Sequence, residues 1–196
     1  AVANLLDWTG HQVVREYYVN DFGAQVQTLA RSVHLRYQEA LGRRVTMPPR
    51  SYPGEYVAEV ARGLAREFGP RYLDGPEAEW LDLFRDRAVA HVLGMIREDL
   101  DAIHIGFDVW SSERKLYESG TVDRFLDELQ AKDLVYRGRL PPPKSKKGAP
   151  AAAGEEGLSV SEELLLFRSS RYGDEVDRPV RKADGTPTYF CADIAY

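Results

Sequence analysis

The first candidate for binding chemistry is a carboxylate that follows a short strand-like segment. Residues 107–110 combine aromatic and β-branched side chains, and Ser111, Ser112 and Glu113 come next. Open α/β sheets bind ligands at the carboxyl ends of their strands, so Glu113 could face a cationic ligand there. In the structural alternative, Ser111 caps a helix and Glu113 complements the dipole of its first turn. Residue spacing favours the structural alternative and leaves the binding role open.

The second candidate is a tyrosine and an aspartate placed four residues apart, Tyr189 and Asp193. On a helix, side chains at this spacing share one face. A phenol and a carboxylate on one face could together hold a planar cation such as a guanidinium. The structural alternative is an aromatic ring packed in the core with an aspartate at a helix end. Spacing alone favours this alternative. The sequence pattern of residues 188–190 is compatible with a strand or with the beginning of a helix.

Most familiar catalytic motifs are absent from the sequence. It contains no GxxxxGK[ST], GxGxxG, HExxH or GxSxG pattern, so nucleotide, metal and serine-hydrolase functions have no direct support. The four histidines, His11, His34, His91 and His104, lie in different predicted elements and are interpreted as structural or solvent-facing. The single cysteine, Cys191, cannot form an internal disulfide, and no Cys/His cluster has zinc-site spacing. We therefore predict no metal site and a reducing, cytoplasmic location.

Hydrophobic patterning predicts an α/β protein that can position these residues. Apolar stripes predict helices at 1–8, at 26–41, at 55–68, from after Pro76 to about 103, and from Thr121 as an N-cap. Runs of β-branched and aromatic residues predict strands at 13–19, 107–110, 134–136, 164–167 and 176–182. The prolines at 48, 49 and 53 make residues 43–54 an irregular connection, and Asp184-Gly185 predicts a turn.

Length, composition and charge limit the classes of protein to which the chain can belong. The chain has 196 residues, 43% of them hydrophobic, which is enough for one domain or for one domain with a smaller appendage. Its net charge of −5 argues against a protein whose whole surface binds phosphate. Segment 141–161 is rich in Pro, Ala and Gly and is predicted to be a flexible loop, although Lys144, Lys146 and Lys147 could touch phosphate. No apolar run reaches the roughly 20 residues that cross a bilayer, so no membrane association is predicted. Apolar helix-like stretches at both ends suggest a piece of a longer protein.

Five ordered motifs give the chain a resemblance to bacterial arginyl-tRNA synthetases over nearly its whole length. They are VREYYVNDFG at 14–23, FDVWSSE at 107–113, LYESG at 116–120, LFRSS at 166–170 and DGTPTYFCADIAY at 184–196. The resemblance implies a class I synthetase, which uses ATP to adenylate arginine and then transfers it to the 3′ end of its tRNA. It also implies the signatures His-x-Gly-His just before Ala1 and Lys-Met-Ser-Lys beyond Tyr196, so this piece alone is expected to be inactive.

The resemblance also implies specific site residues. In that family the glutamate of Ser-Ser-Glu and the tyrosine and aspartate of Tyr-x-x-x-Asp line the amino-acid pocket, which assigns Glu113, Tyr189 and Asp193 to L-arginine. Two carboxylates and a phenol can satisfy several of the five guanidinium donors, whereas the compact ammonium of lysine would leave acceptors unpaired. No catalytic, cofactor-binding or metal-binding residue is assigned within the chain. ATP, with Mg²⁺ expected, and tRNA(Arg) are implied for the full-length enzyme.

The implied architecture is α/β, part of a Rossmann-like catalytic domain with a mostly helical insertion. Residues 1–42 and 106–196 would belong to the catalytic core and residues 43–105 to the insertion, whose outward arginines, such as Arg62, Arg66 and Arg71, are candidates for tRNA contact. A monomer is expected. The alternative function is a synthetase-derived tRNA-binding or regulatory module without catalysis. A different α/β enzyme sharing short stretches would require a phosphate or metal motif that the sequence lacks.

Overall fold

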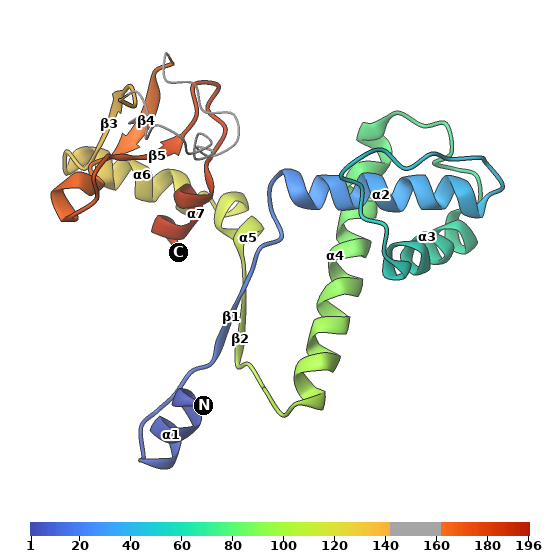
Figure 1. The fold of residues 1–196 in the computed structure, drawn as a ribbon, viewed down its shortest axis with the longest axis horizontal. Coiled ribbons are helices and arrows are strands. Elements are labelled where there is room, and N and C mark those ends of the chain that lie inside the picture. Colours follow the sequence, from blue (N-terminus) through green and yellow to red (C-terminus); the bar gives the residue numbers. More distant parts are fainter. Residues whose placement is uncertain (142–161) are drawn as a thin grey trace, which may run out of the picture. The chain divides into compact units, whose positions relative to one another are not determined.

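The computed structural model describes residues 1–141 and 162–196. The loop predicted at 141–161, with its three lysines, lies outside the described residues except for Pro141. The chain divides into two compact units, an N-terminal unit of Ala1–Ser112 and a C-terminal unit of Glu113–Tyr196 (Figure 1). No helix among the described residues is long and apolar enough to cross a membrane.

The N-terminal unit joins a pair of parallel strands to three packed helices. Its elements are α1 (Val2–Trp8), β1 (Glu16–Val19), α2 (Ala24–Ala40), α3 (Glu55–Phe68), α4 (Glu77–Ala102) and β2 (Val109–Ser112). β1 pairs with β2 from Glu16 opposite Val109 to Val19 opposite Ser112. Parallel strands need a long crossover connection, and α2, α3 and α4 provide it (Figure 1). The predicted helices of this unit are confirmed to within about two residues.

The second strand lies two residues further along the chain than predicted. The backbone N–H groups of Asp108 and Val109 both donate to the carbonyl of Arg15, at 2.7 and 3.1 Å, and the carboxylate of Asp108 accepts a hydrogen bond from Arg15 N. The ladder with β1 therefore starts only after Phe107. Phe107 instead packs edge-on against Tyr17, with ring centroids 5.2 Å apart.

Aromatic side chains fill the core between α2, α3 and α4. Phe84 is fully buried and contacts Tyr37 and Trp80 edge-on, with ring centroids 5.2 and 5.5 Å apart. His34 stacks on Trp80 at 3.8 Å, and its Nε2–H donates to the carbonyl of Tyr72 at 2.8 Å. The interpretation of His34 as structural is confirmed.

Burial of His34 makes the stability of this unit depend on pH. Burial lowers the pKa of the imidazole below its ordinary value of 6.5, and this outweighs the opposing effects of the Tyr72 carbonyl and Glu77. Because the unfolded chain then binds the proton more readily than the folded one, the stabilisation is complete above the unfolded-state pKa and is lost as pH falls from that value through the lowered folded-state pKa. We expect the urea midpoint of tryptophan fluorescence to decrease from pH 7.5 to pH 5.5.

All three tryptophans, Trp8, Trp80 and Trp110, lie in the N-terminal unit, so this signal reports on that unit alone. The matched control is His11→Gln, at an exposed position, which should keep the pH dependence. A His34→Gln variant with the same dependence as the wild-type chain would contradict the assignment.

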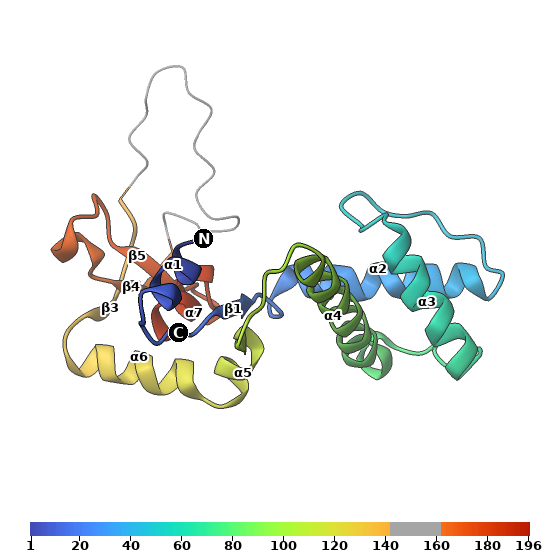
Figure 2. The same cartoon turned by 90° about the horizontal axis from the view of Figure 1, so that it is seen from below.

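The C-terminal unit packs helices against a three-stranded antiparallel sheet. It contains α5 (Glu113–Glu118), α6 (Thr121–Ala131), β3 (Val135–Gly138), β4 (Leu164–Phe167), a 3₁₀ turn η1 (Ser169–Tyr172), β5 (Arg178–Arg181) and α7 (Tyr189–Ala195). The strand order is β3-β4-β5, with α6 against β3 and α7 against β5 (Figure 2). The predicted hairpin-like pair is confirmed by the antiparallel β3 and β4. The buried side chains include Val122, Leu126, Leu129, Val135, Val180 and Cys191.

One prediction for this unit is wrong, because Thr121 does not cap α6. Gly120 is the N-cap, and Thr121 is the first helical residue. Gly120 has φ 68°, a left-handed conformation that glycine adopts without a steric penalty, so α5 can end and α6 begin within a few residues. The predicted turn at 184–185 is confirmed, with Asp184 Oδ1 accepting a hydrogen bond from Thr186 N at 2.8 Å.

Candidate functional site

The start of α7 is held by a buried threonine. Thr188 is the N-cap residue, and its backbone N–H donates to the carbonyl of Val180 at 3.1 Å. Its hydroxyl donates to the carbonyl of Pro179 at 2.7 Å, so both groups attach the helix entrance to β5. Residues 188–190 are therefore a helix entrance, the second of the two predicted states. This anchoring determines which face of α7 packs inward.

Tyr189 and Asp193 lie on the outward face of α7. The four-residue spacing on a helix is confirmed, because both fall within Tyr189–Ala195. Cys191 and Ala192 are fully buried, whereas Tyr189 is 58% exposed and Asp193 is also exposed. The structural alternative, a tyrosine packed in the core, is therefore wrong. Two side chains able to accept hydrogen bonds instead share a solvent-accessible face.

Glu113 differs from this pair because it is almost completely buried. It is the first residue of α5, directly after β2, and only 5% exposed. Its predicted place in the first turn of a helix is confirmed, and so is its place at the carboxyl end of a strand. The predicted cap by Ser111 is wrong, because Ser111 belongs to β2, pairs with Tyr18 and donates its hydroxyl hydrogen bond to Glu16.

The three predicted residues come from two helices of the same unit. α5, which begins at Glu113, contacts α7, which carries Tyr189 and Asp193 (Figure 1). The tertiary structure thus brings together helices whose relevant residues are 76 or more positions apart in the sequence. A buried carboxylate needs hydrogen-bonding or charged partners. Glu113 and Asp193 are thus two carboxylates, one buried and one exposed, on two helices that contact each other.

One residue at a strand end was missed by the sequence reasoning. Asp21 follows β1, is only 7% exposed, and accepts a hydrogen bond from the hydroxyl of Ser112 at 2.7 Å. Ser112 ends β2, so this bond joins the carboxyl ends of the two parallel strands. The signal that could have identified Asp21 is its position two residues after a predicted strand, because the carboxyl ends of strands in open α/β sheets bind ligands.

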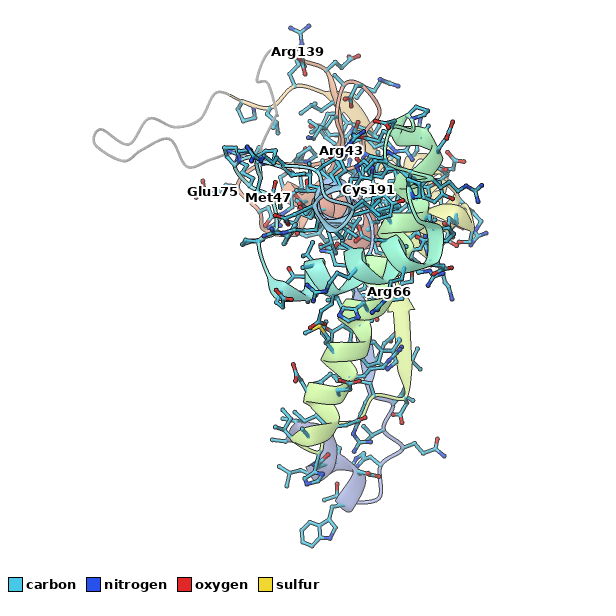
Figure 3. The ribbon with its side chains drawn as sticks, turned by 90° about the vertical axis from the view of Figure 1, so that its right-hand side faces the viewer. Arg43, Met47, Arg66, Arg139, Glu175 and Cys191 are labelled. Carbon is cyan, nitrogen blue, oxygen red and sulfur yellow. The ribbon has the colours of Figure 1, made fainter. Side chains whose placement is uncertain are left out.

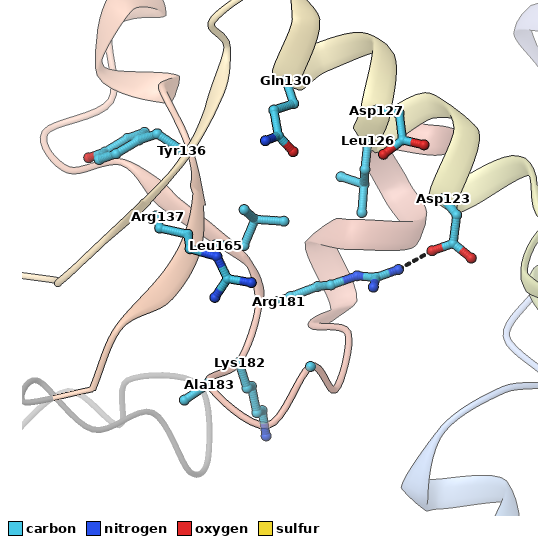
Figure 4. Close-up of a pocket in the computed structure, with 11 residues that line it drawn as sticks. Asp123, Leu126, Asp127, Gln130, Tyr136, Arg137, Leu165, Arg181, Lys182 and Ala183 are labelled. Atoms are coloured by element: carbon cyan, nitrogen blue, oxygen red, sulfur yellow. Dashed lines mark hydrogen bonds and ion pairs between the residues drawn. The ribbon is translucent and has the colours of Figure 1, made fainter.

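A cavity beside α6 is separate from these residues. It has a volume of about 330 Å³ and is lined by charged side chains from α6, β3 and β5, including Asp123, Asp127, Arg137 and Arg181 (Figure 4). Arg181 forms an ion pair with Asp123 in its wall (Figure 4). Glu113, Tyr189 and Asp193 do not line it. In the part of the chain that the structure describes, no group of three or more His, Cys, Asp or Glu side chains could hold a metal ion.

The outward arginines of the N-terminal unit are exposed as predicted. Arg66 lies on the surface of α3 (Figure 3). Arg62 donates to Glu55 at 2.6 Å, and the guanidinium of Arg71 lies 5.2 Å from the centre of the Tyr72 ring. Two of the three thus have partners within the unit, which reduces their availability to a nucleic acid.

Comparison with solved structures defines the class of protein. No protein-family model matches the chain. A crystal structure from Campylobacter jejuni, assigned as an arginyl-tRNA synthetase, matches 98% of this chain and 37% of its own, with a TM-score of 0.74 and 28% sequence identity. The fold is therefore similar to part of an aminoacyl-tRNA synthetase.

Sequence comparison gives similarity to part of one family of enzymes. Arginine–tRNA ligases from Anaeromyxobacter dehalogenans and Novosphingobium aromaticivorans are 73% and 52% identical to this chain over its full length. The chain spans about one third of the length of these curated relatives, 33% and 32%. The resemblance predicted from the five motifs is confirmed: the chain is similar throughout to one portion of arginine–tRNA ligases.

Proposed function

We propose that this chain is part of an arginine–tRNA ligase and contributes Glu113, Tyr189 and Asp193 to the arginine pocket. The ligase would adenylate L-arginine with ATP and transfer it to tRNA(Arg). The observation that supports the site most directly is the shared outward face of Tyr189 and Asp193 on a helix that contacts α5. The high identity along the whole chain supports the substrate.

The proposed pocket distinguishes arginine from lysine through hydrogen-bond geometry. The guanidinium is planar and offers two parallel N–H groups, which a carboxylate such as Asp193 accepts as a bidentate pair. The phenol of Tyr189 and the carboxylate of Glu113 add further acceptors for the remaining donors. A lysine ammonium is a single compact donor group that cannot form the bidentate pair, so part of this acceptor set would stay unpaired after desolvation.

The parallel pair of β1 and β2, joined by a helical crossover, supports a Rossmann-like class I catalytic domain for the parent ligase. In this proposal residues 1–42 and 106–196 belong to the catalytic core, and residues 43–105 form the helical insertion. ATP, with Mg²⁺, would be bound by parts of the ligase outside the portion matched here. The residues of this chain would bind and orient arginine and would not supply the groups that act on the phosphates.

Titration of the chain with L-arginine and, as the control ligand, L-lysine tests the proposal. We expect weak binding that favours arginine by at least about tenfold, because loss of one charge-assisted hydrogen-bond pair costs roughly 1.5–3 kcal/mol. Heteronuclear NMR would follow the amides of Glu113, Tyr189 and Asp193, and calorimetry would give the affinities. Equal affinities for the two amino acids would contradict the pocket. Salt-dependent tRNA binding without any arginine binding would favour the alternative of a tRNA-binding module.

A further inference from the structure

The N-terminal unit contains a cavity that the arginine pocket does not use. It has a volume of about 310 Å³ and lies at the carboxyl end of β1, between α2, α3 and α4. Four tyrosines line it: Tyr17 and Tyr18 of β1, Tyr52, and Tyr56 of α3. Aliphatic side chains of α4 also line it, namely Val89, Val92, Leu93 and Ile96. Its volume falls at the lower end of the roughly 300–1,000 Å³ typical of small-ligand sites.

Two of the four tyrosines are held in place by their surroundings. The backbone N–H of Tyr52 donates to the hydroxyl of Ser32 at 3.0 Å, and that hydroxyl donates to the carbonyl of Thr28 at 2.7 Å. The ring of Tyr56 lies over Gly54, where an added Cβ would overlap with its Cε1. The cavity wall at this point is therefore preorganised, which lowers the entropic cost of binding a ligand.

The lining indicates a planar, uncharged ligand with a polar edge. Aromatic rings and aliphatic side chains form most of the wall, and no lysine or arginine lines it. A phosphate would find no countercharge there, and the carboxylate of Asp21, which also lines the cavity, would repel it. The amides of Asn20 and Gln25 line the cavity as well. Amide side chains bond the edges of nucleobases, and aromatic side chains stack on their faces.

We infer that this cavity binds an unstacked nucleobase of a single-stranded RNA segment, while the phosphates of that segment remain outside. The inference rests on the proposed function, which supplies an RNA substrate. Asp21 connects the cavity to the end of β2, because its carboxylate accepts the hydrogen bond of Ser112. A nucleobase seated beside the strand ends would help to position the RNA strand for the transfer step of the parent ligase.

Fluorescence anisotropy with a labelled single-stranded oligoribonucleotide tests the inference on the full chain. We expect the single strand to bind at least tenfold more tightly than a blunt duplex of the same sequence. Tyr56→Leu, which keeps apolar volume and removes the ring, should weaken single-strand binding by about tenfold, as loss of one stacked base does. The dependence on salt should stay the same in this variant, because no phosphate contact is removed.

Gly54→Ala provides a second variant that leaves all four tyrosines present. Gly54 has φ −63° and ψ 155°, which alanine adopts freely, so the main effect expected is displacement of the Tyr56 ring, with a small loss of helix stability because alanine is a poorer N-cap than glycine. It should weaken binding in the same direction. Tyr172→Leu is the matched control, because Tyr172 is 69% exposed and does not line the cavity. Tryptophan-monitored urea unfolding would verify that the N-terminal unit of each variant remains folded.

The inference would be overturned if folded Tyr56→Leu and Gly54→Ala bound the single strand as tightly as the wild-type chain. If adenosine or ATP binds the cavity and the oligonucleotide does not, the cavity is a site for a free nucleotide. That result would overturn the RNA assignment. Titration of the same samples with L-arginine separates this inference from the proposed function. If the chain binds L-arginine but not the oligonucleotide, the assignment of the cavity is wrong and the proposed arginine pocket is unaffected.

Discussion

Asp193→Ala is expected to weaken L-arginine binding by about 10-fold to 150-fold. The substitution removes the carboxylate proposed to accept a bidentate pair from the guanidinium, and hydrogen bonds to charged groups contribute about 1.5–3 kcal/mol. Alanine is a strong helix former, and Asp193 is exposed, so α7 should remain helical. Calorimetric or NMR titration gives the affinity. Asp193→Asn, which retains an acceptor but not the charge, should give an intermediate loss.

Asp127→Ala is the matched control for this prediction. Asp127 is also an exposed aspartate on a helix of the C-terminal unit, but it lies on α6 and lines the cavity of about 330 Å³. Both substitutions change the net charge equally, so a nonspecific electrostatic effect would appear in both. Loss of arginine binding in Asp127→Ala, with binding retained in Asp193→Ala, would move the site to the cavity beside α6.

The fold of these variants can be checked through Cys191. It is the single cysteine of the chain and is fully buried in the C-terminal unit. Burial raises the pKa of its thiol, an effect opposed by Arg181, so that the folded unit should react slowly with thiol reagents. Rapid labelling of Asp193→Ala without denaturant would show that the unit had opened and that the affinity loss was indirect.

Phe84→Ala is expected to destabilise the N-terminal unit by about 3–5 kcal/mol, the usual cost of removing a buried aromatic ring. Phe84 is fully buried and makes ring contacts with His34, Tyr37, Tyr72 and Trp80. The substitution therefore leaves a cavity where α2 and α4 pack together. Because domains are stable by only about 5–15 kcal/mol, the urea midpoint measured by tryptophan fluorescence should decrease strongly.

The control for the core substitution is Trp8→Ala. Trp8 is 87% exposed at the end of α1, so its removal should change the unfolding free energy by no more than about 0.5 kcal/mol. Cys191 labelling should stay slow in folded Phe84→Ala at low urea, because the thiol lies in the other unit. A loss below about 1 kcal/mol in Phe84→Ala would contradict the packing described for α4.

The sequence by itself determined most of the elements and the chemistry of the candidate site. The helices α2, α3 and α4 have apolar stripes long enough for periodicity to locate them within about two residues. Tyr189 and Asp193 were candidates because their four-residue spacing would place them on one face of a helix, although spacing did not decide between a binding and a structural role. The family resemblance then assigned Glu113 to the same site. The local sequence pattern around Glu113 is compatible both with binding a cationic ligand and with complementing a helix dipole.

Only the tertiary structure decided burial and register. The start of β2 depends on hydrogen bonds to Arg15, about 90 residues away, and no local pattern encodes a partner at that distance. The attachment of Thr188 to β5 determines that Cys191 is buried and Tyr189 exposed, although either could have packed inward by residue type. The tyrosine-lined cavity likewise joins residues of four segments. Local propensity acts over a few residues, whereas burial and cavities arise from contacts between segments far apart in the chain, which is why the sequence pattern could not predict them.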